Sequence, residues 1–118
     1  MKSLQDKIWD TITDSAKRKF DYPSFEETFP TAQIADNVLF KIISGLSAGW
    51  SKNKIASSLL TDFLVIGYKT DAAEWVKFID DNESSFKLEI LASQMARDML
   101  DSGGDPIAVH GSISQLLH

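Results

Sequence analysis

The chain contains no cysteine and only two histidines among its 118 residues. Without cysteine the protein has no disulfide, no thiolate metal ligand and no thiol nucleophile. His110 and the C-terminal His118 lack the companion residues that a zinc site or an activated nucleophile requires. We therefore expect a protein that has no enzymatic activity and binds no metal or cofactor, and whose fold is held by packing alone.

Long apolar stretches are also missing from the sequence. The longest, Phe63 to Ile66, is far shorter than the roughly 18–20 residues that span a bilayer. Charged residues interrupt every apolar run near the N-terminus, so no signal-peptide core can be drawn there. These absences predict a soluble, cytoplasmic protein without a membrane segment.

Positive charge is scarce relative to negative charge. The chain has 12 Lys and Arg against 17 Asp and Glu, which gives a formal net charge of −5 and a pI near 4.8. Nucleic-acid-binding proteins usually present a basic face, because phosphate contacts supply most of their affinity. This charge balance makes nucleic acid and anionic lipid poor ligands and favours a basic protein as the partner.

Apolar residues recur at three- and four-residue spacing along most of the chain, which is typical of amphipathic helices. No segment alternates with period two for long enough to predict a strand. Short connections separate the helical segments, and the length supports one hydrophobic core. The sequence therefore predicts an all-α, compact single domain over residues 1–118, a bundle of five to six short helices packed as antiparallel neighbours.

Capping residues and glycines predict the helix boundaries. The predicted ranges are 3–19, 31–47, 51–66, 71–80, a helix from 82–85 to 103, and a last helix that begins after Asp105. Asn82 or Ser84 is the expected cap of the fifth helix. Two prolines interrupt residues 20–30, where Ser24 and Glu27 are expected to cap one short turn and the aromatic side chains to pack on the core.

A dense acidic segment lies between residues 71 and 83. Its carboxylates are Asp71, Glu74, Asp80, Asp81 and Glu83. Within the segment only Lys77 opposes them, and Tyr68 lies just before it. Such a charge run is either a solvated helix face or a surface that meets a basic partner.

Part of the acidic segment resembles a calcium-binding EF-hand loop, because Asp80, Asn82 and Ser84 occupy its first, third and fifth positions. The sixth position, a glycine in such loops, is Ser85, and the twelfth, a bidentate glutamate, is Leu91. Both essential parts are missing. We therefore expect no specific calcium site.

Trp50 and Tyr68 are the aromatic residues most suited to a partner surface. Both lie next to glycine at predicted helix ends, where part of the ring can stay exposed. Interface hot spots favour these residue types. Together with the acidic segment they form the predicted partner-binding site.

Residues 49–59, with the sequence Gly-Trp-Ser-Lys-Asn-Lys-Ile-Ala-Ser-Ser-Leu, resemble the start of a helix-turn-helix. The resemblance implies a DNA-binding or transcription-related protein that uses the helix starting at Ser51. The chain departs from the pattern after Leu59, because it continues with apolar residues where a tight turn should follow. Only Lys52, Lys54 and Lys69 could form a basic footprint there.

These features favour a small acidic protein-binding domain. By analogy with small acidic inhibitors, the leading hypothesis is a bacterial inhibitor or immunity-type protein that masks a basic toxin or nuclease. The DNA-binding protein implied by the helix-turn-helix resemblance is the alternative, and an enzyme is the third possibility.

Overall fold

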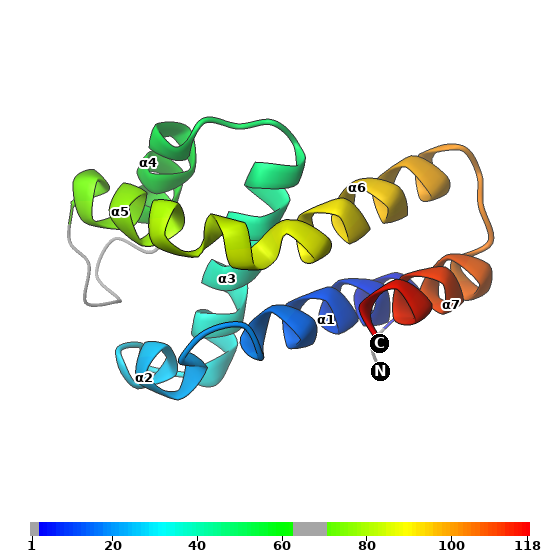
Figure 1. Cartoon of the computed structure of the whole chain (residues 1–118), viewed down its shortest axis with the longest axis horizontal. Helices are drawn as coiled ribbons and strands as arrows, with labels where there is room; N and C mark the ends of the chain where they lie inside the picture. The colour runs from blue at the N-terminus through cyan, green and yellow to red at the C-terminus, as the bar shows by residue number, and fades with distance from the viewer. Residues whose placement is uncertain (1–2, 63–70) are drawn as a thin grey trace.

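The computed structural model describes residues 3–62 and 71–118, and it contains helices and no strand within these ranges (Figure 1). The helices are α1 (Leu4–Lys17), α2 (Tyr22–Glu27), α3 (Ala32–Ser47), α4 (Lys52–Asp62), α5 (Ala72–Asn82), the 3₁₀-helix η1 (Glu83–Phe86), α6 (Lys87–Asp101) and α7 (Pro106–Leu117). The predicted all-α fold is confirmed. None of the helices in these ranges combines the length and apolar character needed to cross a bilayer.

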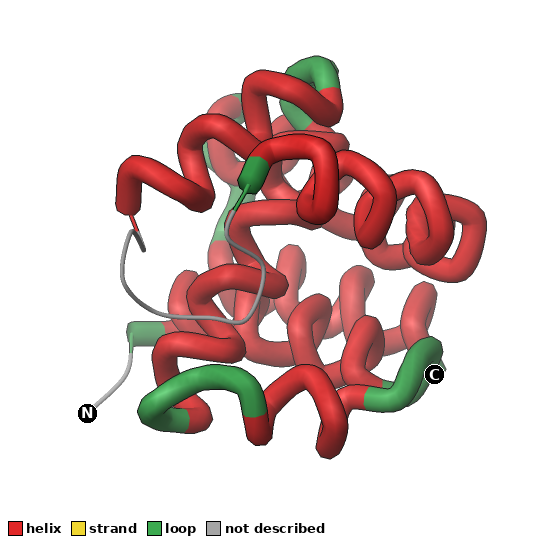
Figure 2. The backbone as a smooth tube through the Cα atoms, turned by 90° about the vertical axis from the view of Figure 1, so that its left-hand side faces the viewer, coloured by secondary structure: helices red, strands yellow, loops and turns green. Residues whose placement is uncertain are grey.

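Helix α3 is the centre of the fold. It contacts α1, α2, α4 and α6 and has the largest set of buried residues of the described helices. Figures 1 and 2 show α4, α5 and α6 above α1, α2 and α7, with α3 passing from one layer to the other. Helix α3 therefore crosses its neighbours steeply, while α1 packs beside α6 and α7, and α4 beside α5.

Most helices begin at the polar residues that the sequence predicts. The side chains of Ser3, Thr31, Ser51, Asp71 and Asp105 each accept a hydrogen bond from a backbone N–H in the first turn of the following helix. Each cap satisfies a donor that the helix itself leaves unpaired. These polar residues fix where the elements start.

The predicted cap of the short helix α2 is wrong. Asp21, not Ser24, is its N-cap, and the backbone N–H of Ser24 donates to Asp21 Oδ1 at 3.3 Å. Pro23 lies in the first turn, where its missing N–H is not needed. Asp21, the acid before the Tyr-Pro pair, is therefore the cap, and the backbone N–H of Ser24 donates the hydrogen bond that it accepts.

The junction after α5 also differs from the prediction. Helix α5 continues past Asp80 to Asn82, and the Asn82 side-chain amide donates to the Phe78 carbonyl at 2.8 Å. Neither Asn82 nor Ser84 caps α6, because η1 intervenes and α6 starts after Phe86 without a side-chain cap. Phe86 is buried, so its packing fixes the start of α6 in place of a polar cap.

The end of α3 has the hydrogen bonds of a Schellman motif. Gly49 adopts a φ of +81°, and its N–H donates to the Leu46 carbonyl at 3.2 Å. The N–H of Trp50 donates to the Gly45 carbonyl at 2.9 Å. This left-handed conformation favours glycine, so Gly49 ends α3 as predicted and fixes the backbone of Trp50 beside it.

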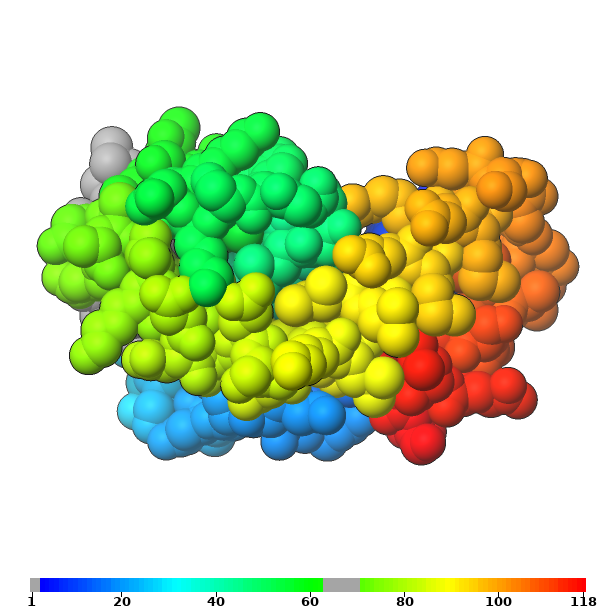
Figure 3. Space-filling view, turned by 45° about the horizontal axis from the view of Figure 1, so that its top comes forward, coloured from blue at the N-terminus to red at the C-terminus, as the bar shows by residue number. Residues whose placement is uncertain are grey.

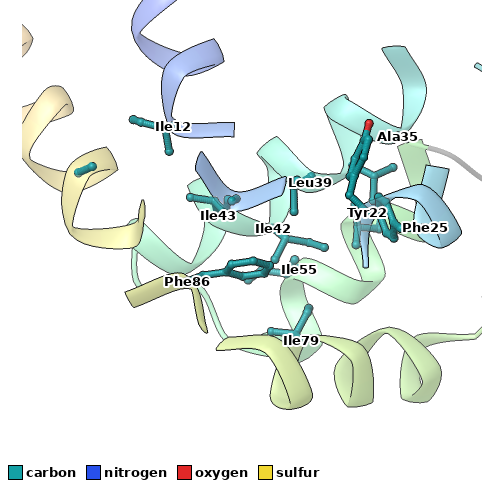
Figure 4. Close-up of a cluster of buried hydrophobic side chains, with 14 of the residues drawn as sticks. Ile12, Tyr22, Phe25, Ala35, Leu39, Ile42, Ile43, Ile55, Ile79 and Phe86 are labelled. Carbon is teal, nitrogen blue, oxygen red and sulfur yellow. The ribbon is translucent and has the colours of Figure 1, made fainter. Parts of the chain in front are cut away.

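Apolar side chains from α1 to α7 form the core. Figure 4 shows Leu39, Ile42 and Ile43 of α3 between the surrounding helices. Aromatic rings extend the core beneath residues 20–30: Phe20 lies within 6.1 Å, centroid to centroid, of four rings, those of Tyr22, Phe25, Phe78 and Phe86. The prediction that this segment packs through its aromatic residues is confirmed.

Candidate functional site

The predicted acidic segment extends from the cap of α5 to η1. Asp71, Glu74, Asp80 and Asp81 are exposed, and Glu83 is half-buried. Tyr68, which the sequence places beside them, lies outside the described residues. The carboxylates that can be located thus follow the length of α5 and its junction with α6.

Lys52 of α4 reaches this segment, which the sequence alone did not reveal. Its Nζ pairs with Asp80 Oδ1 and lies 2.8 Å from Glu83 Oε2. The hydrogen bonds that the Lys52 ammonium donates to Asp80 and Glu83 raise its pKa to about 12. Two of the five carboxylates are therefore ion-paired within the molecule, where they join α4 to the end of α5, and a third, Asp71, caps α5.

Glu74 and Asp81 are the two acids of α5 available to a partner. They are seven residues apart, so they lie on one face of the helix two turns apart. Neither forms an ion pair with a described residue. Lys77 is also exposed on this face, three residues after Glu74 and four before Asp81, so the face keeps two carboxylates against one ammonium group after the internal ion pairs are formed.

Trp50 is 37% exposed, as the sequence predicts for a ring next to a helix-ending glycine. The Lys54 ammonium lies 4.2 Å from the centroid of its ring. The ring borders a groove of about 560 Å³ whose lining is Asn37, Phe40, Lys41, Ser44, Gly45, Ala48, Trp50 and Arg97. Figure 3 shows a hollow between the α3–α4 connection and the second half of α6.

Phe40 is the aromatic residue of this groove that the sequence analysis did not select. It is also 37% exposed, and it packs edge-on against Trp9 of α1 with centroids 6.0 Å apart. The sequence does indicate that Phe40 is exposed, because it lies outside the stripe of apolar residues with which α3 faces the core. An aromatic residue outside that stripe is expected to leave part of its ring exposed to solvent.

A second hollow, of about 670 Å³, lies between α1 and α3. Its lining is Asp6, Trp9, Asp10, Thr13, Gln33, Asp36, Asn37 and Phe40. Asp36 accepts a hydrogen bond from the Tyr22 hydroxyl and lies 2.9 Å from Lys17 Nζ. Burial and this hydrogen bond raise the pKa of Tyr22 well above its ordinary value.

The lysines that a helix-turn-helix would use are engaged elsewhere. Lys52 pairs with Asp80 and Glu83, and Lys54 stacks on Trp50. Lys69 lies outside the described residues. In the part of α4 that can be seen, the basic residues are used for contacts within the molecule, which leaves little positive charge to meet phosphate.

Glu89 is a buried carboxyl group that the sequence analysis did not select. Ser15 Oγ donates to Glu89 Oε2 at 2.6 Å, and Lys19 Nζ lies 3.8 Å from the same oxygen. Glu89 Oε1 has no hydrogen-bond partner among the described residues. These contacts tie α1 to α6 in the interior.

Groups typical of catalysis or metal binding are sparse in the described ranges. His110 Nε2 lies 3.3 Å from Thr11 Oγ1, half-buried between α1 and α7. No cluster of three or more His, Asp or Glu side chains suited to a metal ion occurs within residues 3–62 and 71–118. The sequence-based expectation about calcium stays a prediction.

Comparisons of this chain with protein-family models, with curated proteins and with solved structures gave no match. The function is therefore argued from the surface itself.

Proposed function

We propose that this protein binds a basic protein and masks its surface, in the manner of a bacterial inhibitor or immunity-type protein directed at a toxin or nuclease. The observation that carries the proposal is the exposed acidic face of α5. Glu74 and Asp81 stand there without an ion pair among the described residues, although Lys52 already engages Asp80 and Glu83.

Exposed charge mainly changes the rate at which two proteins associate. Exposed carboxylates attract a basic surface over a distance of about a Debye length, roughly 8–10 Å at physiological salt. They speed association, while buried aromatic contacts determine how long the complex lasts. The overall charge of −5 adds to the same attraction.

The test starts with a defined partner. The protein is used as bait at low salt in an extract of its source organism, and neighbouring genes are examined for a basic toxin or nuclease. Association rates of the purified pair are then measured at several salt concentrations. We expect rates that fall as salt rises, because screening weakens the attraction.

A matched pair of variants tests the α5 face. Glu74→Gln with Asp81→Asn removes two charges from α5, and Asp98→Asn with Asp101→Asn removes two exposed charges from α6. The first variant should slow association about three- to tenfold at low salt, and the second should change it little. Equal effects would show that only net charge matters and would exclude the α5 face as the contact.

Binding to random duplex DNA separates this proposal from the helix-turn-helix alternative. An acidic inhibitor should show no measurable affinity for DNA at physiological salt. Affinity for duplex DNA that falls steeply with salt would contradict the proposal and favour a DNA-binding protein that uses α4.

A further inference from the structure

The carboxylates of Asp80 and Glu83 receive a cation from inside the molecule. Lys52, at the start of α4, pairs with Asp80 Oδ1 and lies 2.8 Å from Glu83 Oε2. Helices α4 and α5 pack side by side, so Lys52 reaches both acids from a neighbouring element (Figure 1). Its ammonium group is therefore a counter-ion that the fold itself supplies.

This contact leaves half of each carboxylate open. Lys52 uses Asp80 Oδ1 and Glu83 Oε2, and the second oxygen of each acid has no partner among the described residues. The side chains of Asp80 and Glu83 are 51% and 42% exposed. Ion pairs between exposed side chains contribute little to stability, so Lys52 can leave these acids without unfolding the protein.

A hollow of about 310 Å³ lies beside the same two carboxylates. Its lining is Asp80, Glu83, Ser84, Lys87 and Ile90, and Lys52 does not belong to it. This volume is at the lower limit of small-molecule sites, which are about 300–1,000 Å³, and it suits one long side chain. A side chain that enters the hollow meets both acids on a path that Lys52 does not block.

Charge around the hollow is balanced while Lys52 is in place. Asp80 and Glu83 carry two negative charges, and Lys52 and Lys87 carry two positive ones. Lys87 forms no ion pair with a described residue. Without Lys52 the remaining three groups have a net negative charge, which attracts a cation into the hollow.

Arginine is the side chain best matched to a pair of acids. Its planar guanidinium group carries five N–H donors in a fixed fork, so it can donate to two carboxylate oxygens at once. A lysine carries its charge at a single point and has no such fork. The second oxygens of Asp80 and Glu83 are therefore better acceptors for an arginine of a partner than for a second lysine.

We propose that Lys52 is an autoinhibitory contact, which occupies Asp80 and Glu83 until an arginine of a basic partner enters the hollow and takes its place. The exchange adds these two carboxylates to the acidic face of α5 only when a matching side chain is present. The inference rests on the proposed function, because it takes the partner to be a basic protein. It gives that function a means to select arginine over positive charge in general.

The probe is a peptide of four arginines with blocked ends, titrated at low salt into the ¹³C,¹⁵N-labelled protein. We expect the backbone amide signal of Ser84, in the lining of the hollow, and the side-chain Cε signal of Lys52 to shift with the same dissociation constant. A peptide of four lysines should bind about three- to tenfold more weakly. This measurement uses the unaltered protein, so a loss of folding cannot produce the result.

Two lysines of α4 provide a matched pair of variants. Lys52→Met removes the counter-ion and keeps a side chain of similar length, whereas Lys54→Met removes the same charge from a lysine that stacks on Trp50. The first should raise the affinity for the arginine peptide about three- to tenfold, and the second less than about twofold. Asp80→Asn with Glu83→Gln, added to Lys52→Met, should abolish the gain.

The inference is overturned if the Lys52 and Ser84 signals do not shift together, if the lysine peptide binds as well as the arginine peptide, or if Lys52→Met and Lys54→Met raise the affinity equally. A gain that survives the loss of both carboxylates would also overturn it. A captured basic partner whose association depends on Glu74 and Asp81 but not on Lys52 would remove this inference and leave the proposed function intact. Exchange of Lys52 by the arginine peptide without any captured basic partner would do the reverse.

Discussion

Gly45 of α3 faces the side chain of Ile55 in α4. A Cβ atom at this position would lie 2.7 Å from Ile55 Cγ1 and 3.6 Å from Trp50 Cε3. Ile55 is fully buried, so its side chain has little room to move away. The missing side chain of Gly45 therefore sets the spacing of the two helices and the position of the Trp50 ring beside α3.

Gly45→Ala should lower the free energy of unfolding by about 1–3 kcal/mol, the usual cost of overpacking a core. Gly111→Ala is the control, because a Cβ there meets nothing within 4 Å and the residue lies inside α7. It should raise stability by about 0.5–1 kcal/mol through helix propensity. Urea denaturation measures both changes, and a loss at Gly111 equal to that at Gly45 would contradict the steric argument.

Ser15→Ala should lower the free energy of unfolding by about 1–3 kcal/mol, because it removes the hydroxyl that donates to buried Glu89. In a Glu89→Met background the same change should cost much less, since an apolar side chain needs no donor. A double-mutant cycle, measured by urea denaturation, gives the coupling free energy between the side chains of Ser15 and Glu89. Equal costs of Ser15→Ala in both backgrounds would show that the hydrogen bond contributes nothing specific.

Residue spacing alone was an incomplete guide to which side chains α6 buries. The pattern of apolar residues predicts Leu91 on the core face, yet Leu91 is 45% exposed. The buried residues are Glu89, Ala92, Ser93 and Ala96. Small residues let α6 approach its neighbours closely. Ser93 Oγ lies 3.1 Å from Ser47 Oγ of α3. A buried polar pair of this kind depends on the partner helix, which local spacing does not reveal.

At the scale of elements, the caps could be predicted because they depend on a few neighbouring residues. Ser51 and Asp71 accept hydrogen bonds from backbone N–H groups three residues later, at 3.1 and 2.8 Å. The start of α6 could not be predicted in this way. It depends on the burial of Phe86, whose ring packs against that of Phe20 from a distant segment.

Ser51→Ala and Asp71→Ala should each lower the free energy of unfolding by about 0.5–2 kcal/mol, because each leaves the first amides of a helix without an acceptor. Chemical denaturation provides the measurement. Ser24→Ala is the comparison, since Asp21 rather than Ser24 caps α2. A larger loss at Ser24 than at the two caps would be inconsistent with the observed helix starts.

The contact between Lys52 and the end of α5 should weaken at alkaline pH. The folded-state pKa of Lys52, about 12, lies above the ordinary value of 10.5 for a lysine side chain. Its contribution to stability is therefore complete below about pH 10 and is lost as the pH rises through 12. The difference in Tm between wild type and Lys52→Met should be constant from pH 7 to about 10 and should shrink above that.

At the scale of the whole molecule, the helical pattern and the buried apolar stripes could be predicted from sequence, but the two hollows beside α3 could not. Side chains of α1 and α3 line one of them, and side chains of α3 line the other together with Trp50 and Arg97 of α6. Local periodicity gives the face of each helix but not which faces meet. Trp50 was recognised because its signal is local, whereas Arg97 gains its role only when α6 packs on α3.

The packing of α1 against α7 has a consequence for how the protein is made. Helix α1 ends at Lys17 and its neighbour α7 begins at Pro106, so the ribosome adds almost ninety residues before the two can meet. At a synthesis rate of about 5–20 residues per second, the apolar face of α1 stays without its contact to α7 for several seconds. A nascent chain halted before Pro106 would lack the packing of α7 on α1 and should be a preferred substrate for chaperones and proteases.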